Sequence, residues 1–350
     1  MTKNEDEALQ AVEVKPYVET VHGKRIFQGI PGIETSGHGK LWVTWYGGGV
    51  TEGPDNFIML AGSSDGGDTW SDVVSVIDPP GKVRAFDPGL WRSLDGRLFL
   101  FWNQSYGNFD GRAGVWISEA IRKSTIPEWG KPVRVGNGVM MNKPIELLDG
   151  TWVLPTAVWG ERFSNLLISD DGGKTFMLLS GTDVNEKQYD EHMVVQGKSG
   201  EINIFVRTHY GIAARISADK GYTWRNYFEG GGWKHDVFRT GPVTRFFISK
   251  LSSGRWLMVY HEHPRLRCNL MAYLSDDEGK TWNEGLMLDE RMDVSYPDAA
   301  VDSDGYIHVV YDRERYGAKE ILTARFTEED VLSRRIVDSN SRLKVIVNKA

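Results

Sequence analysis

Strand-like segments recur along the chain, each opened by a glycine turn. Their residues are apolar or alternate between apolar and polar, as in GHGKLWVTWY, LDGRLFLFW and SDGYIHVVYD. The turn glycines are Gly39, Gly96, Gly150, Gly200, Gly254 and Gly305, with spacings of 57, 54, 50, 54 and 51 residues. Such runs between turn glycines are typical of β-strands. Their regular spacing predicts a repeated β-sheet unit of about 53 residues.

A second motif, Ser-x-Asp-x-Gly-x-Thr followed by Trp or Phe, is interleaved with the first. It occurs at Ser63–Trp70, Ser169–Phe176, Ser217–Trp224 and Ser275–Trp282. The first gap of 106 residues is twice the repeat length, so we expect a decayed copy near Ser118 and a sixth near Thr327. In this Asp box the Asp caps turn amides, the Gly takes a positive φ and the aromatic packs between sheets. The boxes are therefore interpreted as structural, not catalytic.

Six interleaved copies of both motifs predict an all-β fold, a six-bladed β-propeller with four-stranded antiparallel blades and Asp-box turns. We expect a single domain over residues 1–350. In it, residues 1–20 form an N-terminal extension, the blades span about residues 21–335, and the C-terminal tail closes the ring. Helix is expected only near Glu119–Ser124 and Glu328–Arg334.

Composition agrees with many short strands and turns. The 350 residues include 39 Gly, 13 Trp, 13 Tyr and 14 Phe. The formal charge of −7 and the absence of a basic run argue against nucleic-acid binding. A single cysteine, Cys268, excludes an internal disulfide framework and a cysteine-based zinc cluster. No run of 18 apolar residues exists, so no membrane partner is expected.

The start MTKNEDEALQ is polar and acidic and has no apolar signal segment. We therefore expect a cytoplasmic protein, or a secreted or periplasmic one if a signal peptide has been removed. No cofactor is expected. His261 and His263 in YHEHPR have the spacing of a metal pair, but no third ligand follows at a fixed spacing, so no metal site is predicted.

Counting from the turn glycines gives equivalent positions in the six blades. Nine residues before each glycine stand Ile30, Asp87, Met141, Glu191, Arg245 and Tyr296. Seven residues after each stand Tyr46, Asn103, Ala157, Arg207, His261 and Asp312. Both sets are predicted at one face of the propeller, with the Asp boxes at the other. Two carboxylates, a guanidinium and a phenol near one axis are costly to desolvate unless they serve each other or a ligand. A water-filled, salt-bridged channel is the alternative to a ligand site.

These residues resemble those of the sialidase (neuraminidase) superfamily over most of the chain, from about Phe27 to Val331. In DEHMVVQGKSGEINIFVR, Glu191 stands sixteen residues before Arg207, as the family's glutamate precedes an arginine that binds the substrate carboxylate. HPRLRCNLMAYLSDDEGKTW offers a further arginine at Arg267, with Arg265 as its rival. VSYPDAAVDSDG places Tyr296 at the family's tyrosine. The resemblance implies a Tyr296 nucleophile assisted by Glu191, with Arg207 and Arg267 on the substrate carboxylate.

The chain departs from the family's pattern in the first blade. Where the family usually has Tyr/Phe-Arg-Ile-Pro, this chain reads FQGIPGIE, so Gln28 and Gly29 occupy the position of a third carboxylate-binding arginine. Arg25 lies a few residues too early, and Arg245 from another blade is the candidate replacement. The general acid expected from the resemblance is Asp55 in TEGPDNF, near Glu52. Asp87 in VRAFDPGLW is the alternative, because the register places it in the channel.

Chemistry supports these roles. A 2-keto sugar acid carries a carboxylate beside its anomeric carbon, which suits guanidinium groups and repels an anionic nucleophile. A neutral tyrosine, deprotonated by a glutamate, avoids that repulsion. Each residue also has a structural interpretation: Tyr296 as a channel aromatic bonded to Glu191, Arg207 as an ion-pair partner, and Asp55 as a turn cap. Trp45 and Tyr46 are an aromatic platform for a sugar or core packing, and Trp233 and His235 are similar candidates at the rim.

The leading hypothesis is a retaining exo-glycosidase of sialidase type, acting on a terminal sialic acid or related acidic sugar of a glycan. One alternative is a polysaccharide lyase or other glycosidase on uronate-containing glycans, with Tyr296 or His261 as the base and Arg207 neutralising the uronate. The other is a non-catalytic glycan-binding propeller. The substrate-binding candidates are Arg207, Arg267, Arg245, Gln28, Tyr46 and His261, and carbohydrate is the expected partner.

Overall fold

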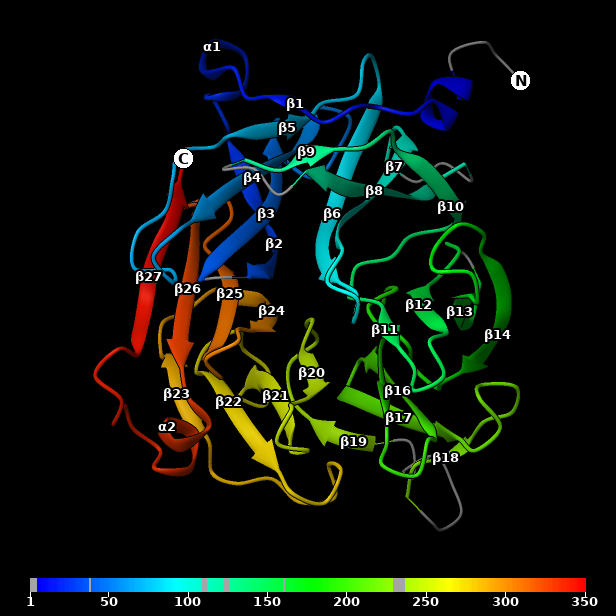
Figure 1. Ribbon diagram of the computed structural model, residues 1–350, viewed down its shortest axis with the longest axis vertical. Helices are drawn as coiled ribbons and strands as arrows, with labels where there is room; N and C mark the ends of the chain where they lie inside the picture. The colour runs from blue at the N-terminus through cyan, green and yellow to red at the C-terminus, as the bar shows by residue number, and fades with distance from the viewer. Residues whose placement is uncertain (1–4, 38, 109–111, 123–125, 160, 229–236) are drawn as a thin grey trace. The chain divides into compact units, whose positions relative to one another are not determined.

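The computed structural model describes residues 5–37, 39–108, 112–122, 126–159, 161–228 and 237–350. In these residues, six antiparallel sheets of four or five strands follow one another along the chain (Figure 1). The predicted fold class, an all-β six-bladed propeller, is thereby confirmed. The chain divides into two compact units, which we describe separately. The expectation of a single domain over residues 1–350 stays a prediction.

The first unit comprises residues 1–139, 294–327 and 338–350 and contains three sheets. One sheet has the order β1 (Lys15–Pro16), β5 (Ser75–Ile77), β4 (Asn56–Ser63), β3 (Lys40–Gly48) and β2 (Phe27–Gly37). The next has the order β10 (Val133–Asn137), β8 (Gly114–Arg122), β7 (Leu98–Tyr106) and β6 (Val83–Arg92), with β9 (Glu128–Trp129) paired to β8. The last runs in order through β24 (Val294–Val301), β25 (Ile307–Arg313), β26 (Glu320–Phe326) and β27 (Arg342–Lys349). A 3₁₀-helix, Glu5–Leu9, and a short helix α1, Glu19–His22, precede β2.

The second unit comprises residues 140–293 and 328–337 and contains the other three sheets. The first consists of β11 (Ile145–Glu146), β12 (Trp152–Thr156), β13 (Phe163–Ser169) and β14 (Met177–Asp183). The second consists of β15 (Met193–Gln196), β16 (Ile202–Thr208), β17 (Gly211–Ser217) and β18 (Arg225–Asn226), with β19 (Val237–Thr240) also paired to β17. The third consists of β20 (Phe247–Lys250), β21 (Trp256–His261), β22 (Leu270–Ser275) and β23 (Leu286–Asp289). The helix α2 (Glu328–Leu332) belongs to this unit.

Apolar strands form because both faces of most sheets are covered. In β7, LFLFWNQSY, all residues except the last are buried. Within the first unit a core cluster joins Ile33, Val43 and Trp45 to Val310 and Ile321 of another sheet. Within the second unit, another core cluster joins Val153 and Leu166 of one sheet to Ile204 and Val206 of the next. Burial on two faces explains why the runs are nearly continuous instead of strictly alternating.

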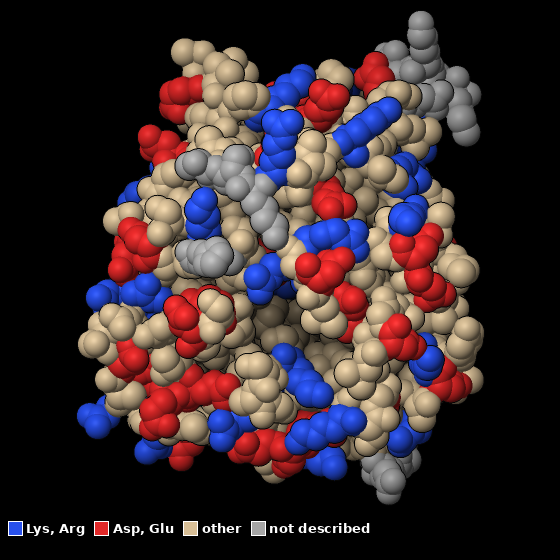
Figure 2. All heavy atoms as spheres, viewed as in Figure 1, with Lys and Arg blue, Asp and Glu red and all other residues tan. Residues whose placement is uncertain are grey.

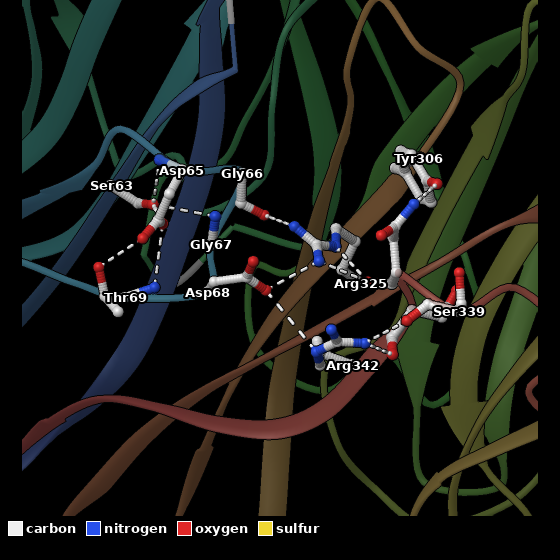
Figure 3. A network of polar contacts seen from close by, with 12 residues as sticks. Ser63, Asp65, Gly66, Gly67, Asp68, Thr69, Tyr306, Arg325, Ser339 and Arg342 are labelled. Atoms are coloured by element: carbon white, nitrogen blue, oxygen red, sulfur yellow. Dashed lines mark hydrogen bonds and ion pairs between the residues drawn. The ribbon is translucent and has the colours of Figure 1, made fainter.

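The turns have the geometry that the two sequence motifs predict. All six turn glycines have a left-handed φ, from 73° at Gly39 to 90° at Gly200. In the first Asp box, Asp65 Oδ1 accepts a hydrogen bond from Ser63 Oγ at 2.8 Å and from the Thr69 amide at 2.9 Å (Figure 3). Asp171, Asp219 and Asp277 make the equivalent contacts in the other three boxes. In the four sheets that carry such a box, the box lies at the end that holds the turn glycine, as the pairing of Ser63 with Leu41 illustrates.

One expected helix is wrong and the other is confirmed. Residues 119–122 continue β8, where Glu119 pairs with Phe99. The apolar partner strand therefore decides the conformation there over local propensity. The second expected helix is α2, which stands where a sixth Asp box was anticipated near Thr327. None of the helices in the described part of the chain is long and apolar enough to cross a membrane.

Candidate functional site

The inner strands of the first unit share one irregularity. A bulge in each places two residues opposite one: Ile30 and Pro31 face Trp45, Asp87 and Pro88 face Trp102, and Tyr296 and Pro297 face Tyr311. The residue before proline has a left-handed φ of 57° at Ile30, 45° at Asp87 and 55° at Tyr296. This conformation costs a non-glycine residue about 1–3 kcal/mol and is concentrated at functional sites. The bulges therefore make these strands candidates for a functional site.

The bulged part of β2 lies against the bulged parts of both β6 and β24. A Cβ atom added to Gly32 would lie 3.2 Å from the Pro88 carbonyl oxygen and 3.5 Å from Asp298 Oδ2. The Ile33 amide donates a hydrogen bond to Asp298 Oδ2 at 2.8 Å, which ties β2 to β24. The predicted site residues Asp87 and Tyr296 therefore stand on two strands, β6 and β24, that both contact β2.

Tyr46 is buried on β3, and its hydroxyl makes no hydrogen bond with any described residue. Burial raises the pKa of Tyr46 well above its usual value, and the negative charges of Asp87 and Glu52 act in the same direction. Arg315 and Arg84 oppose them with a smaller effect. Tyr46 therefore keeps its proton and offers a neutral O–H donor within the electrostatic range of Asp87.

The two candidate acids have different surroundings. Asp55 is exposed in the loop before β4, where the Gly53 amide donates to Asn56 Oδ1 at 2.6 Å and shapes the turn. Asp87 is only 8% exposed and is held in the β6 bulge. Both lie in the first unit, as does Tyr296. The choice between Asp55 and Asp87 as the acid stays a prediction.

Gln28 is fully buried at the start of β2. Its amide oxygen accepts hydrogen bonds from Arg25 Nε at 3.0 Å and Trp45 Nε1 at 3.1 Å, and its amide nitrogen donates to the Lys319 carbonyl at 2.6 Å. These bonds give Gln28 a structural role, because they hold the loop between β25 and β26. Contact of Gln28 with a substrate stays a prediction.

Arg315 is a residue of this cluster that the sequence analysis missed. It stands in the loop after β25, and its Nε donates to Asp312 Oδ2 at 2.8 Å. Its guanidinium carbon lies 4.0 Å from the centroid of the Tyr296 ring. Asp312 was found by the register of the turn glycines, but no spacing extends that register three residues further into a loop.

In the second unit, Glu191 and Arg207 form an ion pair, which is the structural interpretation given above for Arg207. Arg207 Nη1 lies 2.5 Å from Glu191 Oε1, and both side chains are almost completely buried. Arg207 Nη2 donates to the Val243 carbonyl at 2.9 Å, and Arg267 Nη2 donates to the same oxygen at 3.2 Å. Two predicted carboxylate-binding arginines are thus brought together around one carbonyl group.

Arg245 is fixed by a different route. Its Nε donates to Asn142 Oδ1 at 2.7 Å, and Asn142 Nδ2 donates to the His192 carbonyl at 2.9 Å. His192 follows Glu191, so a short chain of hydrogen bonds connects Arg245 with the backbone beside the Glu191–Arg207 pair. His261 is buried at the end of β21 in the same unit.

The YHEHPR segment has a structural explanation for its second histidine. His263 Nδ1 accepts hydrogen bonds from the amides of Arg265 at 3.1 Å and Leu266 at 2.8 Å, and so caps the turn after β21. Among the described residues, no group of three His, Cys, Asp or Glu side chains is arranged to hold a metal ion.

The predicted site residues fall into two groups. Tyr296, Tyr46, Asp87, Asp55 and Gln28 belong to the first unit. The second unit holds Glu191, Arg207, Arg245, Arg267 and His261. The assistance of Tyr296 by Glu191 stays a prediction, and Trp233 and His235 lie outside the described residues. On the face shown in Figure 2, basic and acidic side chains of the described residues are interspersed.

Comparison with known proteins identifies the family. Residues 39–309 match the BNR repeat-like domain, which is more than half of the chain. The chain belongs to this family. The predicted membership of the BNR-repeat propellers is thereby confirmed, and solved sialidase structures share the fold. No curated protein matches the chain.

Solved structures share the fold of this BNR repeat protein at low identity. The Hadza microbial sialidase Hz136 is 17% identical with a TM-score of 0.69, over 87% of this chain and 66% of that one. The intramolecular trans-sialidase from Ruminococcus gnavus, in complex with oseltamivir carboxylate, is 12% identical with a TM-score of 0.68, over 91% of this chain and 98% of that one. A protein of unknown function from Dyadobacter fermentans is 18% identical with a TM-score of 0.64, over 88% and 95%. At these identities the likeness is one of fold alone.

Proposed function

We propose that this BNR repeat protein is a retaining exo-glycosidase of sialidase type that removes a terminal sialic acid or related acidic sugar from a glycan. The observation that carries the proposal is the placement of Tyr296 in the β24 bulge, with a left-handed φ and a guanidinium over its ring. A strained, buried tyrosine beside a charged group fits a nucleophile better than a packing residue. The sialidases among the solved structures of the same fold add to this support.

In the proposed mechanism, Tyr296 attacks the anomeric carbon as its phenol proton passes to Glu191. A phenol has a pKa near 10, so it needs such a base to react at neutral pH. Its neutral ground state avoids repulsion by the carboxylate on that carbon. Water then attacks the same carbon and gives a proton to the carboxylate that protonated the leaving oxygen, while the proton on Glu191 returns to the Tyr296 oxygen. The two displacements retain the anomeric configuration.

The second unit supplies the charges that suit an acidic substrate. Arg207 and Arg267 share the Val243 carbonyl, and guanidinium groups bind carboxylates with two parallel hydrogen bonds. Arg245 is the third candidate, held by Asn142. The leaving oxygen takes its proton from Asp87 or Asp55. Gln28 and Gly29 stand where sialidases usually carry a third carboxylate-binding arginine. For this reason the proposed substrates include acidic sugars other than sialic acid.

The test is turnover of a fluorogenic sialoside, and of the corresponding glycosides of other 2-keto sugar acids, by the wild type and Tyr296→Phe. We expect the variant to lose about 1,000-fold or more in kcat, because the phenol oxygen is the attacking atom. Tyr306→Phe is the matched control, since Tyr306 lies in the Asp-box network of Figure 3. Failure of the wild type on all these sugars would refute the proposal. Formation of an unsaturated uronate product would instead identify a lyase, and binding without any product would identify a glycan-binding protein.

A further inference from the structure

The space beside Gly29 is filled by a side chain from another sheet of the same unit. A Cβ atom added to Gly29 would lie 2.8 Å from Arg315 Cγ and 2.8 Å from Asp312 Oδ2, closer than real Cβ contacts. Gly29 pairs with Tyr46 in the β2–β3 ladder, and the Arg315 carbonyl accepts a hydrogen bond from the Gln28 amide at 3.2 Å. Arg315 can therefore occupy this space because Gly29 has no side chain.

The guanidinium of Arg315 is held firmly. Its Nε donates to Asp312 Oδ2 at 2.8 Å, and its Nη2 donates to Ser295 Oγ at 3.2 Å. Ser295 Oγ in turn donates to Asp312 Oδ1 at 2.6 Å, which closes a ring of hydrogen bonds. Arg315 Nη1 also lies 3.7 Å from Glu52 Oε1, and the Arg315 side chain is only 12% exposed. These contacts leave the Arg315 guanidinium few alternative positions.

This fixed guanidinium covers the face of the Tyr296 ring. Its central carbon lies 4.0 Å from the ring centroid, and its hydrogen-bond partner Ser295 directly precedes Tyr296. A cation over an aromatic face is attracted to the ring electrons. The attraction grows when the phenol loses its proton, because a negative charge then spreads over the ring.

We propose that Arg315 is a positioning residue that holds the Tyr296 ring in the β24 bulge and stabilises its phenolate as the phenol proton leaves. The proposal deepens the proposed function, since it rests on Tyr296 as the nucleophile. It also explains how the chain places a guanidinium beside Gly29 although β2 carries no arginine there.

The ionisation of the neighbouring groups agrees with this geometry. Burial lowers the pKa of Arg315, but attraction to Asp312 and then to Tyr296, Tyr46 and Glu52 raises it above its ordinary value overall. Interactions of this kind are reciprocal, so a group that favours charged Arg315 is itself easier to ionise beside it. Asp87 and Glu52 oppose ionisation of the neighbouring Tyr46. The stacked Arg315 guanidinium places a positive charge against the Tyr296 ring.

The experiment is carbon-13 NMR of the full chain with tyrosine labelled at Cζ, titrated with pH, and with the Tyr296 signal assigned by Tyr296→Phe. In Arg315→Met we expect the apparent pKa of Tyr296 to rise by about one unit, a tenfold loss of phenolate at a given pH. Arg315→Lys should recover part of the shift, because it keeps the charge but loses the planar stack. The double variant Asp312→Asn/Arg315→Met should show a smaller rise, because it also removes the negative charge of Asp312, and it leaves no buried Asp312 carboxylate unpaired.

Arg325→Met is the matched control. Arg325 lies 5.6 Å over the Tyr306 ring in the same sheet but at the Asp-box end (Figure 3), so its loss should leave the Tyr296 titration unchanged. An unchanged Tyr296 pKa in Arg315→Met, or in the double variant if only that variant folds, would overturn the inference. The titration needs no substrate, so this failure is distinct from failure of the glycosidase assay.

Discussion

The two units position their candidate site residues in different ways. In the first unit, backbone bulges at Ile30, Asp87 and Tyr296 aim the side chains, each before a proline. In the second unit, the equivalent residues Glu191 and Arg245 precede the start of β15 and β20 and have no left-handed φ. Their side chains are instead fixed by Arg207 and Asn142.

The difference matches the chemistry proposed for each unit. A nucleophile or a general acid needs one position within a fraction of an ångström, and a bulged backbone is well suited to fix it. Binding a carboxylate needs a set of guanidinium groups, which hydrogen bonds to carbonyls and amides can orient. We therefore expect the first unit to be sensitive to steric changes and the second to changes of charge.

The largest expected effect is in the second unit. Arg207→Met should lower the free energy of unfolding by about 3–5 kcal/mol, because the buried Glu191 carboxylate loses its guanidinium partner. Urea denaturation measures the change. The double variant Glu191→Gln/Arg207→Met removes both charges and should recover much of the loss. Equal destabilisation of the single and double variants would contradict the idea that an unpaired Glu191 charge causes the loss of stability.

The next effect is steric and belongs to the first unit. Gly29→Ala should lower the free energy of unfolding by about 1–3 kcal/mol, because its Cβ would overlap with Arg315 and Asp312. Gly89→Ala is the matched control in another bulged inner strand, since nothing lies within 4 Å of its added Cβ. Equal stability of the two variants would contradict the tight contact with Arg315.

These contrasts show which parts of the molecule could be predicted. The turn glycines and Asp boxes are local motifs with their own backbone geometry, so repeats of them predicted the strands, the turns and the fold class. The Glu191–Arg207 ion pair was foreseen only as the structural alternative for Arg207, because the spacing of sixteen residues was assigned to substrate binding. The bulges were not predicted, because a residue before proline is ordinarily extended, and only tertiary contacts hold Tyr296 at a left-handed φ. Arg315 was missed because a loop carries it to Gly29 from a distant part of the sequence.

The smallest expected effect concerns a feature that both units share. Hydrogen bonds from Thr223 and Ser217 lower the pKa of Asp219 to about 2, and despite the opposing effect of partial burial the Asp65 box also lowers the pKa of Asp65 to about 2. Because the unfolded pKa is about 3.9, each carboxylate stabilises the fold above that pH and loses the contribution as the pH falls towards 2. Asp65→Asn and Asp219→Asn should both flatten the melting temperature between about pH 4 and pH 2.

Asp304→Asn is the control for these two variants, since the Asp304 carboxylate makes no hydrogen bond or ion pair with a described residue. A difference in slope between Asp65→Asn and Asp219→Asn would mean that the Asp boxes are not equivalent in the two units.

Tyr296 is the proposed nucleophile of a retaining glycosidase. Mass spectrometry of the protein after reaction with a fluorinated acidic sugar, whose covalent intermediate is hydrolysed slowly, tests this role. We expect the glycosyl group to be attached to the peptide that contains Tyr296, and Tyr296→Phe to carry none. Attachment to the carboxylate of Glu191 or Asp87, or turnover with inversion at the anomeric carbon, would contradict it.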